Sequence, residues 1–101
     1  MLIINTTFQT DLNDARDFVV WLHEKYIPTT VEQGDLKNPR LTRILSHREQ
    51  DSECFSLQFE VESTLKLHHW HVQVGQQLEQ EMIKMFNERV VGFSTMMEII
   101  E

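Results

Sequence analysis

The chain has 101 residues, of which 41% are hydrophobic and 25% charged, a composition ordinary for one small globular domain. Its formal net charge of -7 argues against binding along nucleic-acid phosphates, which depends on Lys and Arg, so we expect no nucleic-acid partner. The single cysteine, Cys54, excludes an internal disulfide, and no apolar run is long enough for a signal peptide or a membrane span, so we expect a cytoplasmic protein with no membrane partner.

The first predicted element is a strand over residues 2–9, where LIINTTFQ alternates in polarity and is rich in Ile, Thr and Phe. Successive side chains of a strand point to opposite faces. We expect the face toward the helices to carry Ile4, Thr6 and Phe8. The opposite face then carries Ile3, Asn5 and Thr7.

A helix is predicted next, because Asp11 suits an N-cap and apolar side chains then recur at helical spacing. These apolar residues are Ala15, Phe18, Val19, Leu22 and Tyr26. Trp21 lies about 120° from Ala15 on the helical wheel, which predicts a place against an edge strand or in a protein contact. Pro28 lacks an amide proton, so the helix should break or kink near it.

Two further strands are predicted over residues 40–47 and 54–62, joined as a hairpin by the polar turn 48–53. The second strand has a strict period of two. One of its faces, packed on the helices, carries Phe55, Leu57, Phe59 and Val61. The other face carries Cys54, Ser56, Gln58 and Glu60.

The last two predicted elements are a helix, capped by Ser63 or Thr64 and running to about Phe86, and a strand over residues 90–100. The apolar stripe of this helix consists of Leu67, Val74, Leu78, Met82 and Met85. We expect Met97 of the final strand to fill the core together with these methionines.

The predicted order is β-α-β-β-α-β, the split βαβ arrangement of the ferredoxin-like class among α+β folds. Right-handed crossovers place both helices on one face of a four-stranded antiparallel sheet and leave the other face open. In a chain this short, such a face is a good candidate for burial by a second copy. We therefore expect one domain over residues 1–101 that forms a homodimer through the open sheet face.

The run HHWH at residues 68–71 raises the possibility of a metal site. On the helical wheel His71 lies about 40° from Leu67, inside the apolar stripe. His68 lies near the edge of the stripe and His69 on the opposite side. Two imidazoles do not complete a metal site, so we predict no metal. We expect His71 to hydrogen-bond within the core and His69 to be solvated, with a pH-sensitive interface histidine as the alternative.

Several segments resemble an uncharacterised bacterial family, a domain of unknown function of about this length. They are IINTTF at 3–8, Trp21 with YIP at 26–28, RLTRIL at 40–45, FSLQF at 55–59 and FNERVVGFSTMMEII at 86–100. The resemblance implies a dimeric α+β barrel with a ferredoxin-like fold, and no established reaction. The family usually has a His where Tyr26 and Val74 stand here, whereas His23 and His71 each lie about one turn earlier.

More distantly, the fold resembles dimeric α+β barrels that include haem-degrading and quinol-forming monooxygenases. The haem-degrading proteins use an Asn on the first strand with a Trp and a His on the second helix, and Asn5, Trp70 and His71 match these in kind. In that family the His follows the Trp by nearly three turns, whereas here the two are adjacent and point about 100° apart. We therefore expect no haem and no other cofactor.

The open sheet face is the predicted binding surface, because it combines polar groups with apolar Ile3 and Met96. It is either a small-molecule pocket or, as we favour, a hydrated dimer interface in which Asn5 and Gln58 hydrogen-bond across a twofold axis. Arg40 and Arg43 can receive a carboxylate if they point into this space, and otherwise pair with a neighbour such as Glu60 or with water. The candidate residues are Asn5, Thr7, Arg43, Ser56, Gln58, His71, Ser94 and Glu98.

Three hypotheses for the function follow. The first is a homodimeric module that binds a small ligand or a partner without catalysing a reaction. The second is a cofactor-independent enzyme, monooxygenase-like or isomerase-like, that acts on a small aromatic or acidic molecule and uses Asn5, Gln58 and His71 for orientation and proton transfer. The third is a purely structural interaction protein, in which Trp21 and the acidic surface matter more than any cavity.

Overall fold

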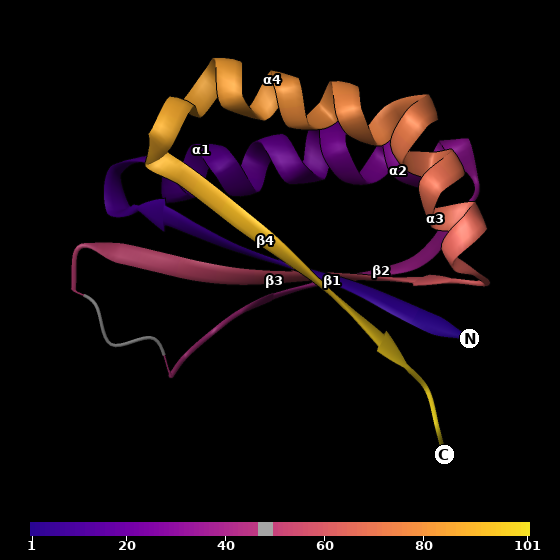
Figure 1. The fold of residues 1–101 in the computed structure, drawn as a ribbon. Helices are drawn as coiled ribbons and strands as arrows, with labels where there is room; N and C mark the ends of the chain where they lie inside the picture. Colours follow the sequence, from indigo (N-terminus) through magenta and orange to yellow (C-terminus); the bar gives the residue numbers. More distant parts are fainter. Residues whose placement is uncertain (47–49) are drawn as a thin grey trace.

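The computed structural model describes residues 1–46 and 50–101 and has the predicted β-α-β-β-α-β order. The predicted strand end at His47 and the turn residues Arg48 and Glu49 lie outside the described residues. The four strands form one antiparallel sheet in the order β2-β3-β1-β4, with the helices over one of its faces (Figure 1). The elements are β1 (Leu2–Asp11), α1 (Leu12–Trp21), η1 (Leu22–Tyr26), α2 (Ile27–Gln33), β2 (Leu36–Arg43), β3 (Ser52–Val61), α3 (Thr64–Trp70), η2 (His71–Gly75), α4 (Gln76–Phe86), η3 (Asn87–Arg89) and β4 (Val90–Glu98). The predicted α+β, ferredoxin-like fold class is confirmed.

Strand β2 starts earlier than the sequence pattern predicts. It spans Leu36–Arg43 rather than 40–47, and its pairing with β3 is interrupted by a bulge at Asn38 and Pro39. The φ angle of Asn38 is 56°, in the left-handed region. Asn and Pro are rare inside strands, and an edge strand with a bulge tolerates both. Because of these two residues, the first half of β2 lacks the alternation of polar and apolar side chains from which a strand is predicted.

The first helix continues through Pro28 instead of breaking there. A π-helical turn, η1, lies directly before α2, and the helix ends at Gly34, whose φ of 101° few other residues adopt. A proline ring in a regular helix clashes with the carbonyl oxygen four residues earlier, and the wider spacing of a π turn relieves that contact. Of the predicted break or kink, the break does not occur, and the distortion beside the proline takes the form of a π turn.

Aromatic rings dominate the core between the sheet and the helices. Phe18 is fully buried, and its ring centroid lies 4.9 Å from that of Phe8 and 5.5 Å from that of Phe86. Trp21 belongs to the same cluster, 6.1 Å from Phe18, and is only 7% exposed. The predicted place for Trp21 at an edge strand or in a protein contact is wrong. Because Phe86 of α4 also contacts Trp21, the first helix is covered from two sides and its buried arc is wider than one stripe.

The second helical layer runs without a break through α3, η2 and α4. Its predicted cap is confirmed, because Ser63 Oγ accepts a hydrogen bond from the Lys66 amide at 3.2 Å. Phe86, rather than Met85, completes the buried stripe of α4, and Met85 is 51% exposed. Met97 is 38% exposed because it lies opposite Ile3, on the sheet face away from the helices. The predicted core positions of these two methionines are therefore wrong. Among the described residues, no helix is long and apolar enough to span a membrane.

Candidate functional site

A cavity of about 460 Å³ lies between the helix-facing side of the sheet and the second helical layer. Phe8 of β1 and Phe59 of β3 contribute aromatic surface from the sheet, and Tyr26 and Trp70 contribute it from the helices. All four of these side chains are buried or half-buried. A hollow of this size with mainly apolar walls is typical of a site for a small organic molecule.

Polar groups line the outer part of the same cavity. His68, His71 and Glu79 of the second helical layer line the cavity and are exposed. On the sheet side, the hydroxyl oxygens of Thr6 and Ser94 lie 3.0 Å apart and form a hydrogen bond. Each hydroxyl group keeps further hydrogen-bonding capacity, since it can both donate and accept. A ligand with an apolar body and a polar end can therefore contact aromatic side chains inside the cavity and polar side chains at its outer part.

Tyr26 brings a neutral phenol to the cavity wall. The side chain is 9% exposed and stands at the end of η1. Burial raises the pKa of Tyr26 far above the usual value for tyrosine, and the negative charge of Glu79 acts in the same direction. The Tyr26 hydroxyl group consequently stays protonated near neutral pH, as a hydrogen-bond donor rather than an anion.

Both helical layers carry a π turn, and both π turns border the cavity. Tyr26 is the last residue of η1, and His71 and Gly75 are the first and last of η2. A Cβ atom on Gly75 would lie 2.7 Å from the Trp70 ring, and Trp70 Nε1 donates to Thr30 Oγ1 at 3.2 Å. The bare backbone and this hydrogen bond together fix the ring as a wall of the cavity. Single π turns inside helices occur frequently at functional sites.

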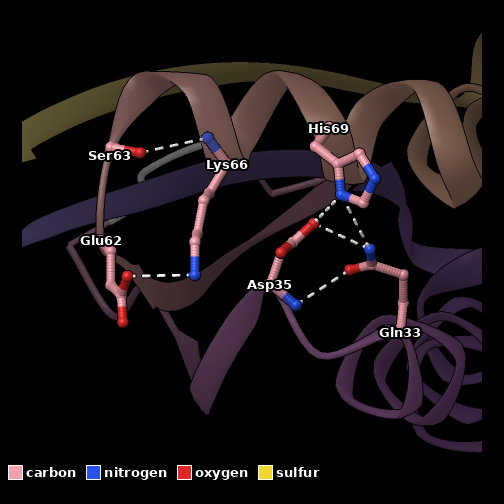
Figure 2. A network of polar contacts seen from close by, with 6 residues as sticks. All are labelled: Gln33, Asp35, Glu62, Ser63, Lys66 and His69. Carbon is pink, nitrogen blue, oxygen red and sulfur yellow. Dashed lines mark hydrogen bonds and ion pairs between the residues drawn. The ribbon is translucent and has the colours of Figure 1, made fainter.

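A polar network ties α3 to the connection between α2 and β2 (Figure 2). Asp35 Oδ2 accepts from Gln33 Nε2 at 2.8 Å and lies 2.5 Å from His69 Nδ1. The bonds from Gln33 and then His69 hold the pKa of the Asp35 carboxyl below its usual value. Lys66 adds an ion pair with Glu62 at 3.1 Å. Since α3 also carries residues of the cavity, this network positions one cavity wall.

The histidines lie differently from the prediction. His71 points to the cavity side as the wheel indicated, but it is exposed, so its predicted burial in the core is wrong. The reason is that the helix stands over a cavity at this point and not over packed sheet. His69, predicted to be solvated, is exposed but paired with Asp35. His68 flanks the stripe at the cavity, as expected.

The polar residues predicted for the open sheet face do come together there. Ser56 Oγ donates to Asn5 Oδ1, and Asn5 Nδ2 donates to Thr7 Oγ1 at 3.2 Å. Gln58 lies directly opposite Asn5 in the sheet. These residues occupy the face away from the cavity, so Asn5, Gln58 and His71 do not form the single catalytic group that the enzyme hypothesis assumed. A shallow hollow of about 380 Å³ on this face touches Gln58 and Arg40.

Ser94, Met96 and Glu98 are not on the open face, contrary to prediction. In the register of β4 with β1, Ser94 lies opposite Thr6 and Glu98 opposite Leu2. Residues directly opposite each other share a face, which here is the face of the helices. Alternation within a strand does not determine which set of residues faces the core when both sets mix polar and apolar residues. The open face of β4 instead carries Val91, Phe93, Thr95 and Met97.

Arg43 also lies on the face of the helices. It stands opposite Phe55 in the pairing of β2 with β3, and its guanidinium carbon lies 5.7 Å from the centre of the Phe55 ring. Arg43 Nε lies 3.6 Å from a carboxylate oxygen of Glu53. The guanidinium group is thus paired within the chain and does not project into the space that was predicted to receive a ligand carboxylate.

Tyr26, Trp70 and Glu79 line the cavity although the sequence pattern did not predict them there. The alternation and stripe patterns identify faces, but they do not show where a helix stands away from the sheet. The sequence does contain one indication of this cavity wall. Gly75 interrupts an otherwise regular helical pattern, and an isolated glycine in a helix often has a packing reason.

Comparisons with known proteins agree on the fold. A family model described as a domain of unknown function, DUF4286, matches residues 1–100. No curated protein matches the chain. Solved structures resemble it along nearly their whole length but have low sequence identity to it, so they show the fold alone.

Three of these structures illustrate the range. A candidate antibiotic biosynthesis monooxygenase from Deinococcus radiodurans has a TM-score of 0.74 and 17% identity, covering 100% of this chain and 94% of that one. An ethd family protein from Bacillus halodurans has a TM-score of 0.69 and 14% identity, covering 99% and 100%. A dimeric ferredoxin-like protein from an uncultured marine organism has a TM-score of 0.67 and 12% identity, covering 98% and 95%.

Proposed function

The chain belongs to the DUF4286 family, a domain of unknown function, and we propose that it binds a small aromatic molecule that carries a hydroxyl group. The observation that supports this proposal is the cavity of about 460 Å³, with aromatic surface inside and polar side chains toward its exposed part. Its volume falls in the range of about 300–1,000 Å³ that is common for ligand sites.

The charge of the cavity favours an uncharged ligand over an acidic one. Glu79 is the carboxylate among its lining residues, and the chain as a whole carries a net charge of -7. A ligand carboxylate near Glu79 would be repelled, whereas a hydroxyl group can donate a hydrogen bond to Glu79 and can also hydrogen-bond the imidazole of His68 or His71. The acidic ligand of the initial hypothesis is therefore the less favoured option.

Calorimetric titration with three naphthalenes tests this proposal. We expect 2-naphthol to bind once per subunit, naphthalene to bind more weakly, and 2-naphthoate to bind about tenfold more weakly than 2-naphthol because of the repulsion from Glu79. Glu79→Gln should reduce the difference between the alcohol and the acid. If none of the three compounds binds saturably, the proposed ligand class is wrong.

A matched pair of variants locates the binding. Ser94→Phe places a large side chain at the cavity, whereas Gln80→Phe places the same side chain on an exposed residue of α4 that lies neither at the cavity nor on the open sheet face. We expect the first substitution to abolish 2-naphthol binding and the second to leave it unchanged. Equal effects of the two variants would contradict a site in this cavity.

We also propose that the protein is a homodimer through the open sheet face. The support is the row of exposed apolar residues on that face of β4, together with a solved structure of similar fold that is described as dimeric. The hydrogen bonds among Asn5, Ser56 and Thr7 satisfy polar groups of this face within the chain, so that burial costs less. Light scattering should give the mass of two chains, and a mass of one chain at high concentration would contradict the dimer.

A second candidate function is the cofactor-independent enzyme, with a changed set of residues. His71 and Glu79 both line the cavity and can exchange a proton with a ligand hydroxyl group, which is a requirement of such chemistry. A candidate monooxygenase among the similar folds is consistent with this reading. If it is correct, the protein accelerates oxygen uptake by 1,4-dihydroxynaphthalene above the spontaneous rate, and His71→Ala removes the acceleration. If the rate of oxygen uptake equals the spontaneous rate, the enzyme hypothesis is wrong and the binding function remains.

A further inference from the structure

Phe93 belongs to two surfaces of the protein at once. It lies directly opposite Thr7 in the sheet, which places it on the open face, and it also lines the cavity on the other side. Its neighbours Gly92 and Ser94 line the same cavity and lie opposite Phe8 and Thr6. Strand β4 is an edge strand of the sheet (Figure 1). At Gly92, Phe93 and Ser94 this strand lies between the cavity and the open face.

The backbone approaches the cavity closely beside Phe93. A Cβ atom on Gly92 would lie 2.9 Å from the Phe8 ring, so that ring rests against the bare strand. Phe93 itself is 66% exposed, although it is a large aromatic side chain. In the isolated chain, this side chain at the cavity wall is therefore mostly in solvent.

The open face has the size that a second copy of the chain needs. Its strands have eight to ten residues, so a four-stranded face measures roughly 19 by 30 Å, and two such faces cover about 1,100 Å². Specific interfaces begin at about 1,000 Å². The exposed apolar row that includes Val91, Phe93 and Met97 would be covered in such a pair.

We infer that a second copy of this chain, seated on the open face, covers Phe93 and thereby completes the wall of the ligand cavity, so that dimerisation and ligand binding strengthen each other. The inference rests on the proposed function. The coupling is reciprocal by thermodynamic necessity: if a ligand tightens the dimer by some factor, the dimer binds that ligand more tightly by the same factor. Phe93 is the residue through which the two equilibria communicate, because it lies on both surfaces.

Sedimentation equilibrium with and without saturating 2-naphthol measures this coupling. We expect 2-naphthol to lower the dimer dissociation constant about tenfold, within the usual range of such couplings. Calorimetry should show 2-naphthol binding more tightly at protein concentrations above that dissociation constant than below it. Phe93→Ser should weaken the dimer and abolish the effect of 2-naphthol on it.

Val91→Ser is the matched control, since Val91 is exposed on the same face of β4 but does not line the cavity. It should weaken the dimer while the effect of 2-naphthol persists. If 2-naphthol binds with one affinity at all protein concentrations, the coupling is wrong and the binding function stands. If 2-naphthol does not bind at any concentration, both the coupling and the proposed ligand class are wrong. If the wild-type chain stays monomeric throughout, the coupling and the proposed dimer are wrong, and the calorimetric titration decides the binding function separately.

Discussion

Nδ1 of His69 lies 2.5 Å from Oδ2 of Asp35, and this contact joins α3 to the start of β2. The two residues are far apart in the sequence, and the loop that carries Asp35 is held further by Gln33 through two hydrogen bonds. The cavity residues Leu67, His68 and Trp70 belong to α3, so the same contact holds a wall of the cavity in place.

The Asp35 network should make stability depend on pH in the acid range. The pKa of Asp35 is lowered by its bonds to Gln33 and His69, so folding favours the carboxylate. This contribution is complete above the unfolded pKa of about 4 and is lost as the pH falls through the lower folded pKa. We expect the Tm of wild type to exceed that of Asp35→Asn by about 2–5 °C near pH 5 and the difference to shrink steadily as the pH falls below the unfolded pKa of about 4.

The control for this measurement is Glu32→Gln, which removes a charge from an exposed position on α2. Its Tm difference from wild type should not show the same decline. Thermal unfolding followed by circular dichroism at several pH values is sufficient. Parallel curves for wild type and Asp35→Asn through the acid range would contradict the role assigned to the network.

Gly75→Ala should destabilise the protein although the substitution usually favours a helix. Alanine is better than glycine in a helix by about 1 kcal/mol. Here the added Cβ atom would lie 2.7 Å from the Trp70 ring, which is held by its bond to Thr30, and overpacking of this kind costs about 1–3 kcal/mol. We therefore expect Gly75→Ala to lower the free energy of unfolding, measured by urea denaturation.

Two further variants separate the steric effect from a general effect on the helix. Gln76→Ala, on the next and exposed residue, should change stability by less than about 0.5 kcal/mol. In the double variant Gly75→Ala with Trp70→Phe, the smaller ring leaves room for the Cβ atom, so the two losses should not add. Additive losses would show that the ring does not limit position 75.

The fold was predictable from the sequence because its determinants are local. Alternation in residues 2–9 and 54–62 separates a core face from an open face, and the structure confirms both assignments through Phe8 and Phe55. Ser63 as a helix cap is a similarly local signal. Strand β4 lacks this information, because Ser94 and Thr95 are both polar while Met96 and Met97 are both apolar.

The cavity was not predictable because its determinants are distant contacts. A helical wheel places His71 on the inner side but assumes that packed sheet lies beneath it. The space between this helical layer and the sheet is bordered by Trp70, which hydrogen-bonds Thr30 on another helix, and by the π turn that ends at Gly75. A period of 3.6 residues predicts none of these features.

Trp21→Ala should cause a large loss of stability, as expected for a core residue. The ring packs against Phe18 at 6.1 Å and Phe86 at 6.2 Å, and truncation of a buried aromatic side chain costs about 3–5 kcal/mol. Val20→Ala, on the adjacent exposed residue, should cost less than about 1 kcal/mol. If Trp21→Ala instead left urea unfolding unchanged and altered only a protein contact, Trp21 would be a surface residue after all.

Tyr26 offers a direct test of the cavity wall, because it is the only tyrosine of the chain and tyrosinate absorbance therefore reports one group. Burial, assisted by Glu79, raises the pKa of Tyr26 above the usual value of about 10, so folding favours the phenol. This contribution to stability is complete below about pH 10 and is lost as the pH rises through the folded pKa.

We expect the folded protein to show no tyrosinate absorbance at about pH 10.5, and the signal to appear only when circular dichroism reports unfolding. In urea the group should titrate near pH 10, and Glu79→Gln should leave the order of events unchanged because burial is the larger cause. A gradual titration near pH 10 with unchanged circular dichroism would place the hydroxyl group in solvent and remove Tyr26 from the wall of the cavity.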